Sequence, residues 1–295
     1  MKQIWLRIVW RWLPKRVLSR WIGKLCRQHW SRRLIPYYVR RFDIDLNPVK
    51  RPVDEFEHLL AFFIRELRPE TRPIAEGDDV VVSPVDGTIS QIGMIEEGML
   101  FQAKGITYSL EELLGQRQEH VSPFYGGSFM TIYLSPSDYH RIHMPLDGKV
   151  VACTHIPGNL YPVNKFGVNS ITGLFVANER LISYIDSRHC GKIALVKVGA
   201  TNVGSIKVCY DQNITTNQKV KKVMHQIYEP AHDLQKGDEL GWFEFGSTVI
   251  LLFEPGQIEW LNTCVPGTKL QMGQAVAYKL IKRRGVNCTR DKNTG

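Results

Sequence analysis

From Asp79 onward, short runs rich in Val, Ile, Thr and Phe alternate with Gly, Pro, Asn and Asp. Runs of this kind, bounded by turn residues, are typical of β-strands joined in hairpins. The predicted strands are Val80–Val82, Thr88–Ile92, Ser128–Leu134, Gly148–His155, Lys192–Val198, Gly204–Tyr210 and Thr248–Phe253, with one brief helix at Leu110–Leu114. There is no βαβ rhythm and no dinucleotide-binding fingerprint. The sequence therefore predicts an α+β fold, in which a β-rich domain of hairpins and meanders follows amphipathic N-terminal helices.

The N-terminal segment is basic and rich in tryptophan. Residues 1–42 hold twelve Lys and Arg and no Asp or Glu, and five of the seven Trp lie within residues 1–30. Residues 3–13 and 16–29 each place apolar side chains on one helical face and cations on another, with Pro14 between them. Interfacial helices that bind anionic lipid have this pattern. Docking on the body or on a second subunit is the alternative, and the continuous apolar stripe argues against a nucleic-acid partner.

These observations divide the chain into four parts. We expect membrane-associating helices in residues 1–45, a helical connector in 46–78 with a helix at Glu55–Leu67, a β-rich catalytic domain in 79–286 and a polar tail in 287–295. No run approaches the ~18 apolar residues of a spanning helix, and no signal peptide is evident. The six cysteines form no CxxC pair, which indicates reduced thiols. The predicted location is peripheral, on the cytoplasmic face of the cell membrane.

Three short motifs carry residues that could perform chemistry, although each alone is ordinary. Gly246-Ser247 precedes a predicted buried strand and would usually be only a turn. His140 and His143 are three residues apart and could share a helical face, yet no further ligands are evident, so no metal is expected. Asp86 precedes a turn glycine and matters only if it orients a histidine.

Two segments also resemble each other. Both Asp79–Gly87 and Tyr139–Gly148 end in Pro-x-Asp-Gly before a predicted strand. The tetrapeptide is a common turn signal. Its recurrence suggests an internal duplication.

Taken together, the motifs resemble the phosphatidylserine decarboxylase family. That family combines an Asp-Gly turn, an Asp-Tyr-His-Arg-x-His-x-Pro stretch and a Gly-Ser-Thr cleavage site near the C-terminus. The matching segments here are Asp86-Gly87, Asp138–Pro145 and Gly246–Thr248, with further similarity at Phe63–Pro69, Gln102–Leu110, Leu174–Arg180 and Val198–Ile206. The resemblance extends from about residue 50 to residue 283. Phe245 departs from the Leu that bacterial members often have, and we expect its side chain to point away from the cleaved bond.

The resemblance implies a proenzyme that cleaves itself between Gly246 and Ser247. The products would be a large chain, 1–246, and a small chain, 247–295, whose Ser247 becomes a covalent pyruvoyl cofactor. Glycine before the serine would leave room for attack and permit unusual dihedral angles. His143 is then the expected base, Asp86 its orienting partner, and His140 the first choice to protonate the product, with His143 the second. The substrate would be phosphatidylserine and the product phosphatidylethanolamine, with an anionic membrane surface as a partner and a homodimer as a candidate assembly.

Two other functions fit parts of the pattern. A Ser-His-Asp hydrolase uses the same residue types, but its usual Gly-x-Ser-x-Gly elbow is missing at Ser247. A non-enzymatic membrane-binding β domain would need no reactive serine. A denaturing gel separates the first alternative from the proenzyme, because only the proenzyme yields two fragments.

Overall fold

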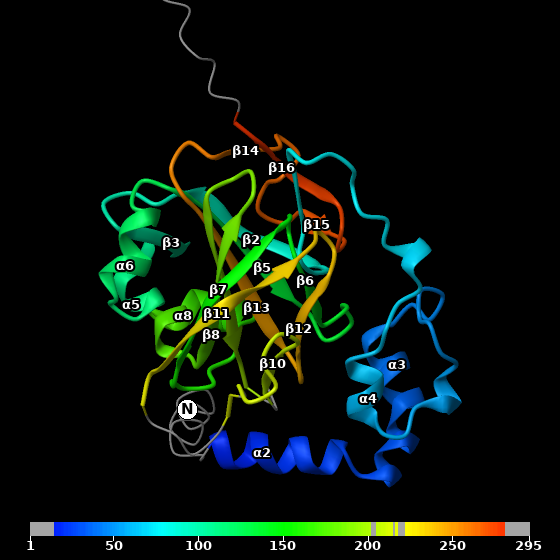
Figure 1. Ribbon diagram of the computed structural model, residues 1–295. Helices are drawn as coiled ribbons and strands as arrows, with labels where there is room; N and C mark the ends of the chain where they lie inside the picture. Colours follow the sequence, from blue (N-terminus) through cyan, green and yellow to red (C-terminus); the bar gives the residue numbers. More distant parts are fainter. Residues whose placement is uncertain (1–14, 202–204, 215, 218–221, 281–295) are drawn as a thin grey trace, which may run out of the picture.

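An eight-stranded antiparallel sheet forms the centre of the computed structural model, which describes residues 15–201, 205–214, 216–217 and 222–280 (Figure 1). In spatial order its strands are β11 (Met224–Leu234), β7 (Gly148–Ile156), β8 (Arg180–Ser187), β9 (Lys192–Gly199), β13 (Ser247–Phe253), β5 (Ser128–Leu134), β2 (Gly87–Met94) and β15 (Lys269–Leu270). All seven residues of β13 are buried. The run that begins at Ser247 is therefore a central strand, held on both edges.

Each face of this sheet has its own hydrophobic core. One face packs on two three-stranded sheets: β10 (Ile206–Val208), β12 (Glu239–Phe243) and β6 (Arg141–His143), and β1 (Val80–Val82), β16 (Ala275–Lys279) and β14 (Ile258–Trp260). The other face is covered by the hairpin β3 (Met99–Ala103) and β4 (Ile106–Ser109) and by α5 (Leu110–Leu114), α6 (Gln118–Val121), η4 (Ser122–Phe124), α7 (Lys165–Ser170) and α8 (Leu174–Ala177). Two-sided burial explains why the central strands are so apolar.

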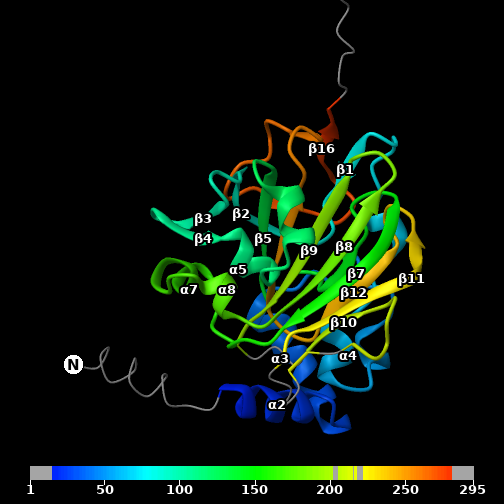
Figure 2. The same cartoon turned by 60° about the vertical axis from the view of Figure 1, so that its left-hand side comes forward.

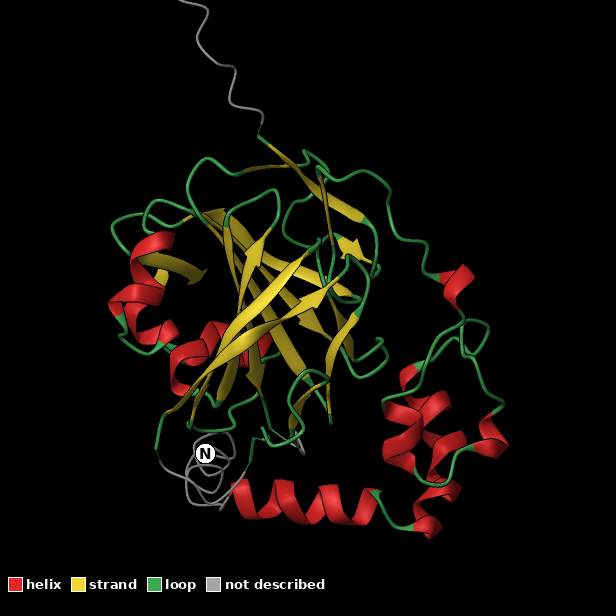
Figure 3. Ribbon diagram, viewed as in Figure 1, coloured by secondary structure: helices red, strands yellow, loops and turns green. Residues whose placement is uncertain are grey.

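The N-terminal helices form a separate group beside the strands (Figure 3). They are α2 (Lys15–Cys26), η1 (His29–Leu34), α3 (Ile35–Phe42), η2 (Val53–Glu55), α4 (Leu59–Phe63) and η3 (Pro69–Thr71). Their small core includes Ile35, Phe56 and Phe62, so it joins residues from both sides of position 45. In two views α2 lies across the lower end of the sheet (Figures 1 and 2). No helix in the described part of the chain has both the length and the apolar character needed to cross a bilayer.

The predicted α+β, β-rich fold is confirmed. The strands at Val80–Val82 and Ser128–Leu134 and the helix at Leu110–Leu114 have the predicted bounds. The helix predicted at Glu55–Leu67 is wrong in length, because α4 covers only Leu59–Phe63. Just beyond its end, the carbonyl of Ile64 accepts a hydrogen bond from Arg141 Nε at 2.9 Å. The helix predicted at residues 3–13 and the tail after residue 286 lie outside the described residues.

Candidate active site

Ser247 begins the central strand β13 and is fully buried. It pairs with Leu134 of β5 on one side and with Gly199 of β9 on the other. Its Oγ has no hydrogen-bond partner. Burying an unsatisfied hydroxyl costs about 1–3 kcal/mol, and such groups in native proteins call for a functional or structural explanation. This hydroxyl adjoins the Gly246–Ser247 peptide bond that the sequence singled out.

The unusual backbone conformation next to this bond is at Phe245, not at Gly246. Phe245 has a φ of 81°, in the left-handed region that non-glycine residues rarely adopt. Gly246 is not among the residues with positive φ. A Cβ on Gly246 would have no atom within 4 Å, which leaves open space around the peptide. Strain of about 1–3 kcal/mol is expected where such a conformation is held.

The side chain of Phe245 packs on Phe63 of α4, with the ring centroids 4.6 Å apart. Phe63 also packs on His140, at a centroid distance of 4.1 Å. Phe63 therefore links the residue before the Gly-Ser pair to one of the two motif histidines. Neither Phe63 nor Phe245 could be recognised as part of the site from the linear pattern, because nothing in it shows that these distant residues meet.

His140 is completely buried beneath Phe63. Its Nδ1 lies 2.8 Å from the carbonyl oxygen of Asp138, so Nδ1 carries the proton and donates it. Its Nε2 is buried without a partner. Burial lowers the pKa of His140 to about 3, since the charged form has lost its hydration. The imidazole is thus neutral at pH 7, with an unused lone pair on Nε2.

His143, the last residue of β6, has both ring nitrogens engaged. Nδ1 donates to the carbonyl of Gly237 at 2.8 Å, and Nε2 lies 3.0 Å from the hydroxyl of Tyr139. The tautomer with its proton on Nδ1 leaves Nε2 to accept from Tyr139. Burial lowers the pKa of His143, opposed by the Gly237 hydrogen bond and by the charges of Glu239 and Asp86. His143 is therefore neutral near pH 7, as a general base must be.

Asp86 is held by Arg72 rather than by a histidine. The guanidinium contacts both carboxylate oxygens, with Nε–Oδ1 at 2.9 Å and Nη2–Oδ2 at 2.5 Å, and the amide of Met272 donates to Oδ1 at 2.8 Å. Its hydrogen bond to Asp86 raises the pKa of Arg72. In this conformation, the group that orients His143 is the Gly237 carbonyl. The role of Asp86 as the orienting partner stays a prediction.

The two Pro-x-Asp-Gly turns have corresponding partners. The matching hydrogen bonds are Asp86–Met272, Ser83–Gly273 and Ser83–Gln274 in the first turn, and Asp147–Lys236, Met144–Gly237 and Met144–Asp238 in the second. The two turn segments also form hydrogen bonds with each other. The amide of His143 donates to the carbonyl of Pro84 at 2.8 Å, and the amide of Val82 donates to the carbonyl of Pro145 at 2.9 Å. Such reciprocity is what a duplicated unit around an approximate two-fold axis produces. It places His143 directly beside the segment that leads to Asp86.

The sheet register brings the Asp86 turn toward Ser247. Thr88 of β2 pairs with Tyr133 of β5, and Ser247 pairs with the next residue, Leu134. The turn and the serine therefore lie on opposite sides of the end of β5, about 10 Å apart at two inter-strand spacings. Gly87 makes this approach feasible, because a Cβ there would lie 2.6 Å from the Tyr133 carbonyl oxygen.

The N-terminal helical group contacts the same region. Arg27, just after α2, forms an ion pair with Glu244 at 2.5 Å. Glu244 is buried, also accepts a hydrogen bond from Ser205, and lies immediately before Phe245. Sequence analysis missed this contact, since Arg27 looked like one more cation for a lipid surface.

Comparison with known proteins identifies the family. A family model for phosphatidylserine decarboxylase matches residues 59–278. The chain belongs to the phosphatidylserine decarboxylase family. A phosphatidylserine decarboxylase proenzyme of Brevibacillus brevis is 49% identical over 267 residues, 90% of this chain and 95% of that protein. Proenzymes of the same name from Myxococcus xanthus and Anaeromyxobacter sp. (strain K) are 42% and 44% identical, over 90% of this chain and 94% of each relative.

The resemblance to the phosphatidylserine decarboxylases is thus confirmed, and the matched range contains Asp86, His140, His143 and Ser247. Among the described residues, the one group of three potential metal ligands with closely spaced donor atoms lies elsewhere, at Glu119, His120 and His225.

The packing of Phe63 on His140 predicts a change in titration. Phe63→Ala should admit water to the ring and raise the pKa of His140 from about 3 toward its ordinary 6.5. In a Ser247→Ala background, NMR should show His140 titrating above pH 5 only in this variant. Phe62→Ala is the matched control, because Phe62 is equally buried but packs on Phe56. Both variants should lose roughly 3–5 kcal/mol of stability. A His140 that titrates alike in the two would contradict the assignment.

Proposed function

We propose that this chain is a proenzyme that cleaves itself between Gly246 and Ser247, and that the two chains together then decarboxylate phosphatidylserine to phosphatidylethanolamine through a pyruvoyl group at position 247. The observation that carries the proposal is the buried, unpartnered Ser247 hydroxyl beside a strained Phe245. The family supports it, because the relatives are named as proenzymes of this decarboxylase.

The self-cleavage steps balance with water as the only added reactant. Ser247 Oγ attacks the carbonyl carbon of Gly246, the C–N bond breaks, and the proton from Oγ passes to the released nitrogen by way of a base. The amide has then become an ester. β-Elimination releases the carboxylate of Gly246 and leaves dehydroalanine at 247. Addition of water and loss of ammonia give the pyruvoyl group.

His143 is the proposed base for the attack. Its Nε2 carries the lone pair, and the pKa that burial lowers keeps it free of a proton at pH 7. Since Tyr139 occupies this nitrogen, His143 acts after Tyr139 has swung aside or through the Tyr139 hydroxyl. The carboxylate of Asp86 stabilises the imidazolium electrostatically, because a nearby negative charge favours the protonated form.

His140 is the proposed proton donor in decarboxylation. Once formed at position 247, the pyruvoyl group would supply an electron-withdrawing carbonyl for the substrate amine. His140 is neutral in the uncleaved chain, so it can donate only after its pKa has risen. Cleavage creates a carboxylate at Gly246, three residues from Phe243, whose amide donates to the His140 carbonyl at 3.0 Å. A new anion nearby raises a histidine pKa. Cleavage would thereby switch His140 toward its protonated form.

We also propose that the N-terminal helices bind the cytoplasmic face of the cell membrane. Several large apolar side chains of α2 to α3 face solvent: Trp21, Leu25, Trp30, Leu34 and Tyr37, each at least 40% exposed. Lys24, Arg32 and Arg33 are exposed among them. Apolar groups flanked by cations are the composition of an interfacial anchor.

Cleavage is tested by the mass of the purified chain. Wild type should yield fragments 1–246 and 247–295, the second carrying a carbonyl that a hydrazide reagent labels. Ser247→Ala should remain one chain, because the attacking oxygen is gone. Ser128→Ala, which removes another buried hydroxyl from the same sheet, should still be cut. A wild-type chain of full mass without a reactive carbonyl would refute the proposal.

The two histidines should separate the two reactions. His143→Ala and Asp86→Ala should slow cleavage by roughly 10²-fold or more, the usual contribution of a general base. His140→Ala should be cut within a few-fold of the wild-type rate but decarboxylate poorly. His189→Ala, in the turn after β8, is the control for both assays. Equal loss of cleavage in the His140 and His143 variants would contradict this division.

Membrane binding is tested by substitutions that keep Arg27 in place. Trp21→Gln combined with Trp30→Gln should reduce co-sedimentation with anionic vesicles by roughly tenfold or more. Each Trp side chain that inserts into the bilayer contributes a few kcal/mol at most to the binding free energy. Phe166→Gln, equally exposed on α7, should have no effect. Cleavage should proceed normally in both variants. Undiminished vesicle binding of the double variant would rule out α2 and η1 as the anchor.

A further inference from the structure

A second cluster of ionisable side chains lies at the edge of the main sheet. Glu119 and His120 belong to the short helix α6, and His225 belongs to the edge strand β11. In Figure 1, α6 lies on the flank of the sheet opposite α3 and α4. The mechanism proposed above uses none of these residues.

The two imidazoles meet through the same ring atom. His120 Nε2 and His225 Nε2 are 3.2 Å apart, and Glu119 Oε1 is 3.8 Å from His120 Nε2. All three donor atoms lie within 4.8 Å of one another. Two nitrogens bound at about 2.0–2.1 Å to a tetrahedral zinc ion are about 3.3 Å apart. The separation of the histidines therefore matches a shared metal ion without rearrangement.

Neighbouring groups fix the orientation of both rings. His225 Nδ1 lies 2.8 Å from Thr154 Oγ1 on β7. When Nδ1 carries the proton and donates to this hydroxyl, the lone pair of Nε2 is free to bind a metal ion. The His120 ring stacks on Tyr184 at 4.1 Å and 15°, and the Tyr184 hydroxyl donates to the Leu114 carbonyl. Metal-binding histidines are typically oriented through such outer partners.

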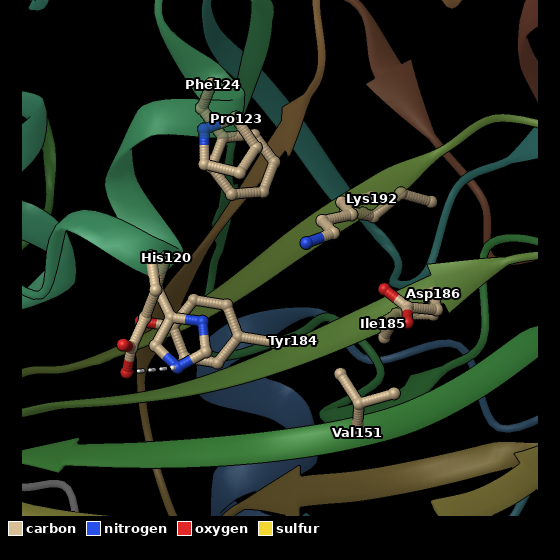
Figure 4. A pocket seen from close by; sticks show the side chains of 10 residues that line it. His120, Pro123, Phe124, Val151, Tyr184, Ile185, Asp186 and Lys192 are labelled. Carbon is tan, nitrogen blue, oxygen red and sulfur yellow. Dashed lines mark ion pairs between the residues drawn. The ribbon is translucent and has the colours of Figure 1, made fainter.

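A hollow of about 170 Å³ opens beside the cluster. Figure 4 shows His120 against Tyr184, with Lys192 and Asp186 on the far side of the hollow. A space of this size holds several water molecules, so a metal ion could complete its coordination with water.

We propose that Glu119, His120 and His225 form a binding site for a divalent transition-metal ion, with zinc the best match. Two imidazoles and a carboxylate are ligands that zinc commonly takes. Glu119 would turn from Arg117, which it contacts at 3.2 Å, toward the ion, and its side chain is 61% exposed and free to do so. The ion would tie α6 to the edge strand β11. The proposal is independent of the pyruvoyl chemistry.

Isothermal titration of the metal-stripped full-length protein with zinc chloride tests this proposal. Wild type should bind one zinc ion per chain and unfold at a higher temperature with zinc than without. His120→Ala and His225→Ala should bind at least tenfold more weakly, and Glu119→Gln should lie between. His232→Ala, on the same strand but outside the cluster, is the matched control and should bind as wild type does. Equal affinity in all variants, or no binding by wild type, would overturn the proposal, with a plain imidazole–imidazole hydrogen bond as the remaining explanation.

Cobalt(II) provides a second measurement that needs no variant to fold. Wild-type protein loaded with cobalt should show visible d–d bands of a low-coordinate histidine site, and one equivalent of zinc should abolish them. The nearest competing explanation is the exposed thiol of Cys209. A near-ultraviolet sulfur-to-cobalt charge-transfer band would assign the metal to a cysteine thiolate and would contradict the site.

Discussion

The ring of Phe63, packed between His140 and Phe245, is the contact on which the candidate site depends most. It buries His140 so completely that the pKa falls to about 3, and it anchors the side chain of a residue whose φ is 81°. A left-handed conformation persists only where surrounding contacts hold it. Phe63 belongs to the N-terminal helical group, so that group is part of the site as well as a candidate membrane anchor. The Arg27–Glu244 ion pair makes a second link between the two.

The sheet supplies the rest of the geometry. Strand β13 is paired with β5 on one side and with β9 on the other, so Ser247 cannot move far. The strained backbone conformation lies just before the strand, at Phe245. The two Asp-Gly turns bond to each other and place His143 beside the Asp86 segment. A rigid serine, a strained preceding peptide and a neutral histidine are what an intramolecular attack on an amide requires.

Much of this could be predicted from sequence, and the limits have physical causes. Strand β5 was predicted to the residue because its apolar run is buried on both faces. Strand β8 was missed because Arg180 and Ser183 look unsuited to a core, yet Arg180 donates to the Leu113 carbonyl and Ser183 accepts from Lys197. The family resemblance singled out Asp86, His140, His143 and Ser247 as candidate site residues. It could not locate the strain at Phe245 or the partners Arg72 and Phe63, since these depend on contacts between segments distant in the chain.

We infer that backbone strain at Phe245 promotes attack on the Gly246 carbonyl. The most direct test compares the cleavage rates of Phe245→Ala and Phe245→Gly precursors in a time course by mass spectrometry. Both lack the ring, and in both the backbone on either side of residue 245 is still held by the contacts of Glu244 and by the pairing of Ser247 in β13. Only alanine then carries the cost of a left-handed conformation, roughly 1–2 kcal/mol. We expect the alanine precursor to be cut roughly 5–30-fold faster than the glycine precursor. Equal rates, or faster cleavage of the glycine precursor, would contradict it.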